Sequence, residues 1–271
     1  MSFRAKLISI TTALGVVVVT ILTFVTVGYN RKILIKSTLE GNKDIALAIS
    51  INVDNYLEEL SRTTKTLATT PAIIECLKES NRQLGSLEEL DRKNRIEALN
   101  DRWMSIDDEN HVFIQEYLSN PIAQYLKKQQ GVIPDLYGEI FLTNIYGELI
   151  ASTEKLTTFS HGEKYWWLEC YNGGKGKVFF DDRGYDDSVG DFVLGVVVPV
   201  YDQGKVIGIL KSNMRIFSLF NKIIENYSPL YKPGVVKIAR TDGVIILEPG
   251  KEPLSTRVAD GFLPMLGKDI E

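Results

Sequence analysis

Residues that could bind a small molecule are concentrated between positions 164 and 213. The sequence Lys-Tyr-Trp-Trp at 164–167 is followed by Gly-Tyr-Asp-Asp at 184–187. Aromatic rings supply flat surfaces with polar tips, and Lys164 and Asp187 could fix a charged ligand at either end. The alternative is that the rings are ordinary core and the acids form a solvated turn. The pattern favours the wall of a binding pocket over the apparatus of an enzyme.

Two other chemistries have less support in the sequence. A hydrolase could use the aspartates at 181, 182, 186 and 187 as acid and base, but they share one glycine-containing turn and no separate carboxylate supplies the second partner. Neither of the two histidines has a cysteine, histidine or carboxylate at ligand spacing. We therefore expect no catalytic residue, no metal and no cofactor.

The composition is that of a folded protein with one membrane segment. The chain has 271 residues, 44% of them hydrophobic, and a net charge of -4. Such a mildly acidic chain argues against a nucleic-acid partner, because binding to phosphates needs clustered Lys and Arg. Cys76 and Cys170 could pair in an oxidising compartment or remain buried thiols.

An uncharged stretch at residues 7–29 predicts a transmembrane helix, because about 20 apolar residues cross a bilayer. A signal peptide is the competing interpretation, but the stretch ends at Tyr29-Asn30-Arg31 without a small-residue cleavage site. Basic residues flank both ends, so charge hardly orients the helix. A short basic N-terminus before a large domain favours a cytoplasmic tail at 1–6, a single anchor in the plasma (inner) membrane, and an extracytoplasmic main domain.

The elements that would position the pocket begin with helices. Residues 30–69 contain no proline and predict one long amphipathic stalk helix, which opens a helical region extending to residue 136. Its membrane-proximal half is expected to pack against a second copy, making a homodimer; a lone helix packed on its own domain is the alternative. Asn120-Pro121 is predicted to start the last helix of this region.

From residue 137 the hydrophobic period changes from 3.6 to 2. Strands are expected on both sides of a turn at 144–147, and again at 177–180, 192–200 and 205–215. Gly195 lies inside a strand, where glycine is unfavourable unless another group must approach closely. These strands predict an α+β, PAS-like antiparallel-sheet lobe at 137–228. Residues 229–271 hold a linker and a second hairpin, read as the start of an incomplete membrane-proximal lobe.

This order of parts resembles the double Cache family, the extracytoplasmic sensor domains of bacterial transmembrane receptors. The resemblance covers residues 7 to the end, and its most specific pieces are the segments at 137–144, 164–167, 185–188 and 198–210. It implies a membrane helix, a stalk helix, a membrane-distal PAS-like ligand-binding lobe and a smaller membrane-proximal lobe.

The resemblance also implies specific ligand contacts. In amino-acid-sensing members an Arg and aromatic residues hold the ligand carboxylate, while a Tyr-x-Asp and a later Asp hold its amino group. These positions fall on the following residues: Lys164, Trp166, Trp167, Tyr185, Asp187 and Asn213. Lys cannot form the bidentate fork of Arg, and Asn213 removes one negative charge, so the ligand could differ from an α-amino acid.

The leading hypothesis is therefore the small-molecule sensor (input) region of a membrane-anchored signal-transduction receptor. An amino acid, organic acid or amine would bind and change the packing of the stalk. In the family the output is a histidine kinase, chemoreceptor, cyclase or phosphatase domain, and this chain contains none, so no enzyme activity is expected. A membrane-anchored binding module acting through a partner protein is the alternative, and an anchored carboxylate-dependent hydrolase is a further one.

Overall fold

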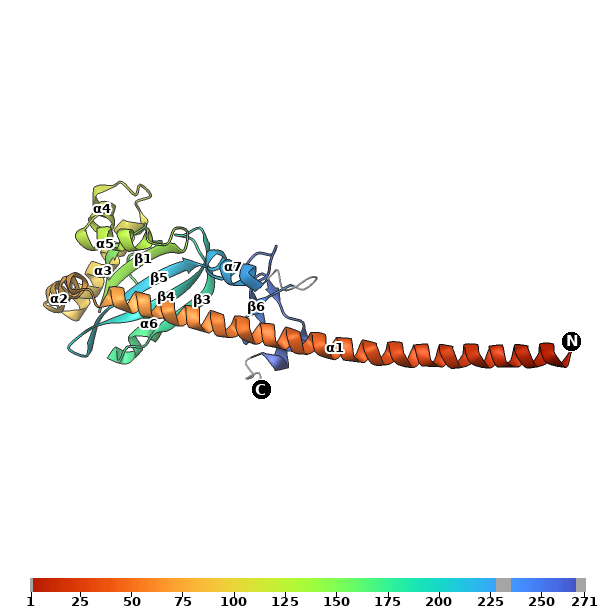
Figure 1. Ribbon diagram of the computed structural model, residues 1–271. Coiled ribbons are helices and arrows are strands. Elements are labelled where there is room, and N and C mark those ends of the chain that lie inside the picture. The colour runs from red at the N-terminus through yellow and green to blue at the C-terminus, as the bar shows by residue number, and fades with distance from the viewer. Residues whose placement is uncertain (1, 228–234, 267–271) are drawn as a thin grey trace. The chain divides into compact units, whose positions relative to one another are not determined.

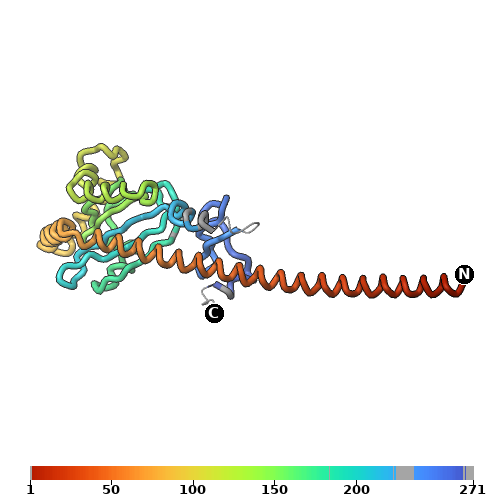
Figure 2. The backbone as a smooth tube through the Cα atoms, viewed as in Figure 1, coloured from red at the N-terminus to blue at the C-terminus, as the bar shows by residue number. Residues whose placement is uncertain are grey.

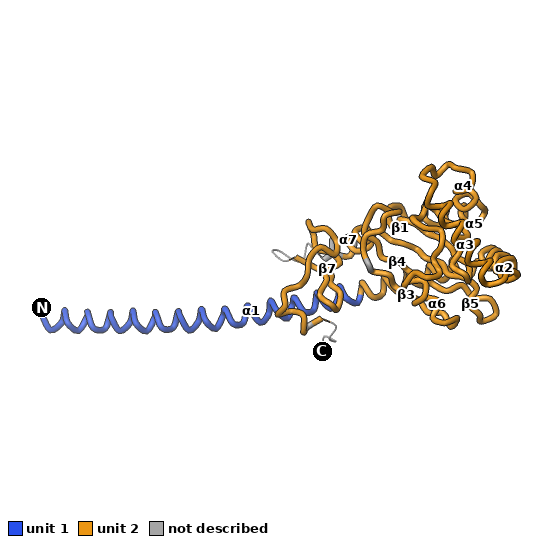
Figure 3. Tube along the Cα trace, turned by 180° about the vertical axis from the view of Figure 1, so that it is seen from behind, with its two compact units in different colours: residues 1–51 blue, residues 52–271 orange. Residues whose placement is uncertain are grey.

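The computed structural model describes residues 2–227 and 235–266 (Figure 1). The chain divides into two compact units, Met1–Ile51 and Asn52–Glu271, which Figure 3 distinguishes by colour. Helix α1 (Phe3–Ala68) runs through the first unit and into the second. It contains the one stretch, among the described residues, that is long and apolar enough to cross a membrane.

The helix of the first unit has the surface expected of a membrane-spanning segment. The large aliphatic side chains of residues 7–39 are exposed along the helix, as expected of a lipid-facing surface. The hydroxyls of Thr20 and Thr23 donate hydrogen bonds to the carbonyls of Val16 and Val19, each at a distance of 2.8 Å. Because these donors are satisfied within the helix, they do not oppose burial in lipid.

In the second unit, α1 packs on the domain that follows it. Leu60 and Leu67 lie in the larger of two hydrophobic cores, with Val53, Tyr56 and Leu57 packed against it. The predicted apolar stripe is thus confirmed over this part of the helix. Here the stripe is covered by the chain's own domain, so it is not available to a second copy.

Four helices separate α1 from the sheet: α2 (Pro71–Gly85), α3 (Glu89–Met104), α4 (Val112–Leu118) and α5 (Pro121–Gln130). The predicted start of α5 is confirmed, because the Asn120 side chain accepts a hydrogen bond from the amide of Ala123 at 2.9 Å and Pro121 occupies the first turn.

The main sheet has five antiparallel strands in the order β2-β1-β5-β4-β3. Their bounds are β1 (Tyr137–Asn144), β2 (Leu149–Ser152), β3 (Phe179–Asp186), β4 (Asp191–Asp202) and β5 (Lys205–Arg215). The expectation of an acidic turn at 184–187 is corrected: a bulge after Asp181 lets pairing with β4 resume, and β3 continues to Asp186. The turn begins one residue later.

The sheet is buried on both faces, which explains its continuous apolar strands. Ile140 and Leu142 of β1 point into the core shared with α1, α2, α5 and α7 (Ile216–Tyr227). Phe141 points into the second core, which contains Trp103 and the short helix α6 (Tyr165–Tyr171). The structure therefore confirms an α+β fold, with helices on either side of one antiparallel sheet.

A small second sheet follows α7, in the blue part of Figure 2. It contains β6 (Ile238–Ala239), β7 (Val244–Leu247) and β8 (Thr256–Arg257), all antiparallel, and a 3₁₀ helix, η3 (Asp260–Met265), comes after it. The predicted hairpin before Leu247 is confirmed, whereas the predicted linker at 229–234 lies outside the described residues. Cys76 and Cys170 are free thiols.

Candidate ligand-binding site

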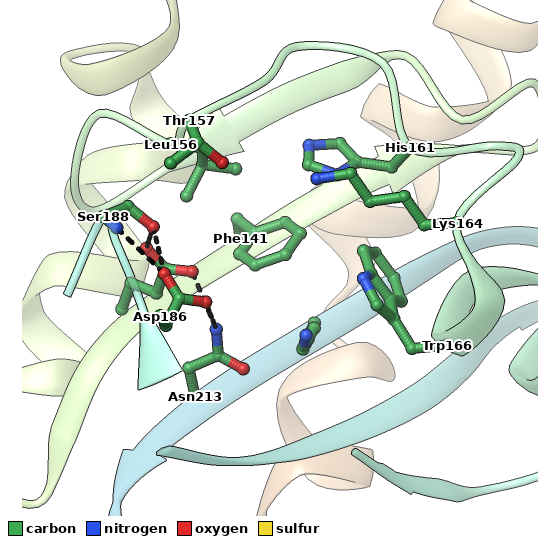
Figure 4. Close-up of a pocket in the computed structure, with 11 residues that line it drawn as sticks. Phe141, Leu156, Thr157, His161, Lys164, Trp166, Asp186, Ser188 and Asn213 are labelled. Atoms are coloured by element: carbon green, nitrogen blue, oxygen red, sulfur yellow. Dashed lines mark hydrogen bonds between the residues drawn. The ribbon is translucent and has the colours of Figure 1, made fainter. Parts of the chain in front are cut away.

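A small cavity, with about 40 Å³ of internal space, lies on the α6 side of the main sheet. That is room for a few water molecules or a small ligand. β1, β5, α6, the end of β3 and the loop between β2 and α6 supply its walls (Figure 4). The lining residues are Glu139, Phe141, Leu156, Thr157, His161, Lys164, Trp166, Asp186, Ser188, Lys211 and Asn213.

Strand pairing brings the sheet residues of this wall together. In β1 and β5 alternate side chains share a face, and the register places Glu139 opposite Asn213 and Phe141 opposite Lys211. Gly195, on β4, is paired with Asn213 of β5. A Cβ at Gly195 would meet Lys211 Cε at 2.6 Å and Asn213 Oδ1 at 2.8 Å. A glycine is required at this position because these two side chains lie across the strand.

One side of the cavity is acidic. The Asn213 amide nitrogen donates to Glu139 Oε1 at 2.8 Å and to Asp186 Oδ2 at 3.0 Å. Ser188 Oγ lies 2.8 Å from Glu139 Oε2 and 2.6 Å from Asp186 Oδ1. Asn213 uses both of its amide hydrogens on the acids, so its Oδ1, which has no partner among the described residues, turns away from them (Figure 4).

These contacts allow Glu139 to hold a proton beside Asp186. Ser188 Oγ is placed to donate to either carboxylate, but a hydroxyl has one hydrogen. When Glu139 is protonated it can instead donate to Ser188, and Ser188 can then donate to Asp186. Burial, and then the charge of Asp186, raise the pKa of Glu139 to about 7, against the hydrogen bonds from Ser188 and Asn213 and the charge of Lys211.

The opposite side is cationic and aromatic. Lys211 is 5% exposed; its Nζ donates to Asp181 Oδ2 at 2.8 Å and lies 4.5 Å from the centre of the Trp166 ring. Figure 4 shows Lys164, His161 and Trp166 across the cavity from Asp186 and its partners. A ligand lying between the two sides would meet opposite charges at its ends.

The structure places three of the six residues expected to contact a ligand at the cavity and the other three elsewhere. Lys164, Trp166 and Asn213 line the cavity. Trp167 lies in the second core, donates from Nε1 to Thr143 Oγ1 at 3.0 Å and stacks on another aromatic ring.

Tyr185 and Asp187 do not line the cavity. Tyr185 is 57% exposed and packs edge-on against Phe192. Asp187 is exposed at the start of the turn, and the carboxylate that faces the cavity belongs to its neighbour Asp186.

Some of the cavity residues that were not predicted carry a recognisable sequence signal. Glu139 and Lys211 are charged side chains next to apolar residues in strands with buried interiors, and a buried charge normally requires a partner or a function. Phe141, Leu156 and Thr157 carry no such signal. His161 lies in a polar loop, where its burial depends on contacts that are distant in sequence.

The acids required by the hydrolase hypothesis do not form a separate acid and base. Asp181 is ion-paired with Lys211, and Asp182 Oδ2 lies 3.6 Å from Arg240 Nη1. Asp186 is bound by Asn213 and Ser188, and Asp187 is exposed. No cluster of three potential metal ligands occurs within the part of the chain that the structure describes.

No protein-family model and no curated protein matches the sequence. The fold, however, matches solved structures. The extracellular domain of vpHK1S-Z8, described as a histidine kinase, has 12% identity and a TM-score of 0.51, over 80% of this chain and 71% of that one. This chain has the fold of an extracytoplasmic sensor domain. The expectation of a sensor-domain fold is thereby confirmed.

Two further matches are also sensory domains. The sensor domain of the V. cholerae histidine kinase DctB shares 13% identity over 79% of this chain and 67% of that one, with a TM-score of 0.49. The ligand-binding domain of the Campylobacter jejuni chemoreceptor Tlp3, solved with L-norvaline, shares 17% identity over 76% and 74%, with a TM-score of 0.40. None of these three is a catalytic domain.

Proposed function

We propose that this chain is the extracytoplasmic input region of a membrane-anchored signalling receptor, and that the cavity between β1, β5 and α6 binds its small-molecule ligand. The observation that carries the proposal is the convergence of four buried polar side chains on one cavity. They are Glu139 (2% exposed), His161 (2%), Lys211 (5%) and Asn213 (1%). Placing so many polar groups in a sensor-domain core is costly unless something uses them.

The distribution of charge indicates the class of ligand. Lys164 supplies positive charge that attracts a carboxylate, since the charge of Lys211 is shared with its partner Asp181, while Asp186 can accept a hydrogen bond from an ammonium group. The aromatic rings of Phe141 and Trp166 would contact the carbon atoms between. An amino acid or a related small molecule carrying both groups fits best, with organic acids and simple amines as the less complete matches.

Thermal unfolding of the full chain in lipid nanodiscs tests the proposal. Glycine, L-alanine, β-alanine, succinate and ethylamine would be added separately, with NaCl at equal ionic strength as the reference. A ligand at about 100 times its Kd should stabilise the domain by about 2.7 kcal/mol. If no compound raises the unfolding temperature above NaCl, the proposal that this cavity binds a small amino acid, organic acid or amine is contradicted.

Two neighbouring aspartates provide matched variants. Asp186 is bonded to Asn213 and Ser188 in the cavity, whereas Asp187, the residue expected from the sequence, is exposed. Asp186→Asn should therefore abolish the stabilisation by an ammonium ligand and Asp187→Asn should preserve it. The reverse result would return the site to the arrangement predicted from sequence.

Signal transmission through the stalk is part of the same proposal. Leu39, Leu47 and Ile51 are exposed apolar residues of α1, and their burial against a second copy would make the predicted homodimer. Ligand binding would then favour one packing of the stalk over another. The membrane would be the plasma (inner) membrane, with residues 1–6 on its cytoplasmic side.

A binding module that acts through a partner protein remains the second candidate. It uses the same cavity, but the ligand would change the affinity for the partner instead of the packing of the stalk. A change in disulfide cross-linking of α1 on ligand binding would favour signalling through the stalk, and its absence would favour the partner protein.

A further inference from the structure

His161 occupies a fixed position in the wall of the cavity. Its amide nitrogen donates to the carbonyl of Gly147 at 2.8 Å, and its carbonyl accepts from the amide of Lys164 at 2.9 Å. The imidazole contacts two aromatic rings that also contact each other, with its centre 5.2 Å from that of Phe141 and 5.6 Å from that of Trp166. Backbone and ring contacts together hold the imidazole at the surface of the cavity.

The imidazole is buried without satisfying its polar atoms. Neither ring nitrogen of His161 forms a hydrogen bond of normal geometry within the described residues. Burial, and then the charges of Lys164 and Lys211, hold the pKa of His161 well below its usual value of 6.5. The interaction of the imidazole with the backbone of Thr158 raises the pKa, but by less than these causes lower it. The ring is therefore neutral, with one N–H to donate and one nitrogen to accept.

We propose that His161 is a ligand-contact residue whose imidazole N–H donates a hydrogen bond to an oxygen of a small carboxylate bound beside Lys164. The inference rests on the proposed function and adds to it a residue that sets specificity. A carboxylate suits this wall because Lys164 lies on it, while Lys211 beside it is paired with Asp181, and a neutral imidazole can donate to an anion. The bond would give this buried ring a hydrogen bond of normal geometry, which it lacks within the described residues.

His161→Phe is the informative variant, because phenylalanine keeps an aromatic ring against Phe141 and Trp166 but has no nitrogen. Without ligand, the variant should unfold at the same or a higher temperature, since a buried unsatisfied polar group is removed. Its half-saturating concentration of acetate, glycine or β-alanine should rise about tenfold or more, as expected for losing a hydrogen bond to a charged group. A residue with only a packing role would not show this combination.

The other histidine provides the control. His111 lies at the N-terminus of α4, where its Nδ1 accepts a hydrogen bond from the amide of Phe113 at 3.2 Å. His111→Asn keeps a side-chain acceptor at that cap and should leave the response to carboxylates unchanged. In wild-type protein with ¹³C-labelled histidine, acetate should shift the ring resonance of His161 and not that of His111.

The experiment uses the full chain in nanodiscs with acetate, glycine, β-alanine and ethylamine, against NaCl at equal ionic strength. Stabilisation by ethylamine alone would overturn the role of His161 while leaving ligand binding intact. Carboxylate affinity within twofold of wild type in His161→Phe would also overturn it. Failure of every probe would refute both proposals. If His161→Phe does not fold, an unchanged His161 resonance at saturating acetate is sufficient to reject the inference.

Discussion

Replacing Glu139 with Gln should stabilise the protein in alkaline but not in acidic solution. The raised pKa of Glu139, about 7 against an ordinary value of 4.5, means that the folded state holds this proton more tightly than the unfolded state. Stability therefore falls as pH rises from about 4.5 to about 7 and is constant beyond that range. The difference of about 2.5 between the pKa of Glu139 in the folded and unfolded states corresponds to about 3 kcal/mol in the free energy of unfolding.

The amide of Gln can replace the protonated acid without titrating. Its nitrogen can donate to Ser188 and its oxygen can accept from Asn213, the two partners that Glu139 has in the structure. Glu139→Gln should thus exceed wild type by about 3 kcal/mol at pH 8 and by less than about 1 kcal/mol at pH 5. His161, whose lowered pKa reduces stability as pH falls below 6.5, titrates in both proteins, so its effect cancels in the difference.

Urea unfolding at pH 5 and pH 8, followed by tryptophan fluorescence, measures these differences. All three tryptophans are buried in the domain that holds the main sheet, so the signal reports that domain. Glu97→Gln, at an exposed helical position, is the control and should change stability by less than about 0.5 kcal/mol at either pH. The reasoning is refuted if Glu139→Gln has the same effect at both pH values or is less stable than wild type at pH 8.

Three further substitutions test the packing around the site by urea unfolding. Lys211→Ala removes the cation of the buried pair with Asp181 and should cost about 3–5 kcal/mol, part of which Asp181→Ala should restore in the double variant; additive losses would deny the coupling. Trp103→Ala should cost about 3–5 kcal/mol, because the indole is fully buried and donates to the carbonyl of Leu156 at 2.7 Å; a loss below about 1 kcal/mol would contradict this packing. Gly147→Ala should cost more than about 1 kcal/mol, since Gly147 has φ +78° and a Cβ would meet the backbone of Gly162, in the loop between β2 and α6. A neutral effect would contradict this conformation of the turn.

Local sequence patterns predicted much of the fold. The change of hydrophobic period at residue 137, the glycine turn before β2 and the Asn120-Pro121 helix start all depend on neighbouring residues, and all three occur in the structure. Strand β3 was predicted too short, because its last part depends on pairing with β4 and on a bulge after Asp181. Such a bulge has no clear sequence signature when the strand is also rich in charge.

The composition of the cavity was harder to predict because it depends on register. In a strand, adjacent side chains point to opposite faces, so a shift of one residue decides whether Asp186 or Asp187 meets Asn213. In a short helix, adjacent residues differ by about 100° in direction, which turns Trp166 to the cavity and Trp167 to the core. The contact between Glu139 and Asn213 joins residues 74 positions apart, beyond the reach of any local pattern.

The most direct test of the sensor function is whether a ligand in the cavity changes the stalk. Ile51→Cys, in a protein without its two native cysteines, would be oxidised in membranes with and without a compound that stabilises the domain. Asn42, exposed and nine residues earlier, lies about two and a half turns away on the opposite face of α1, so Asn42→Cys is the matched control. We predict that ligand changes the rate of disulfide formation at residue 51, and that Asp186→Asn abolishes the change. An unchanged rate at saturating ligand would contradict signalling through the stalk.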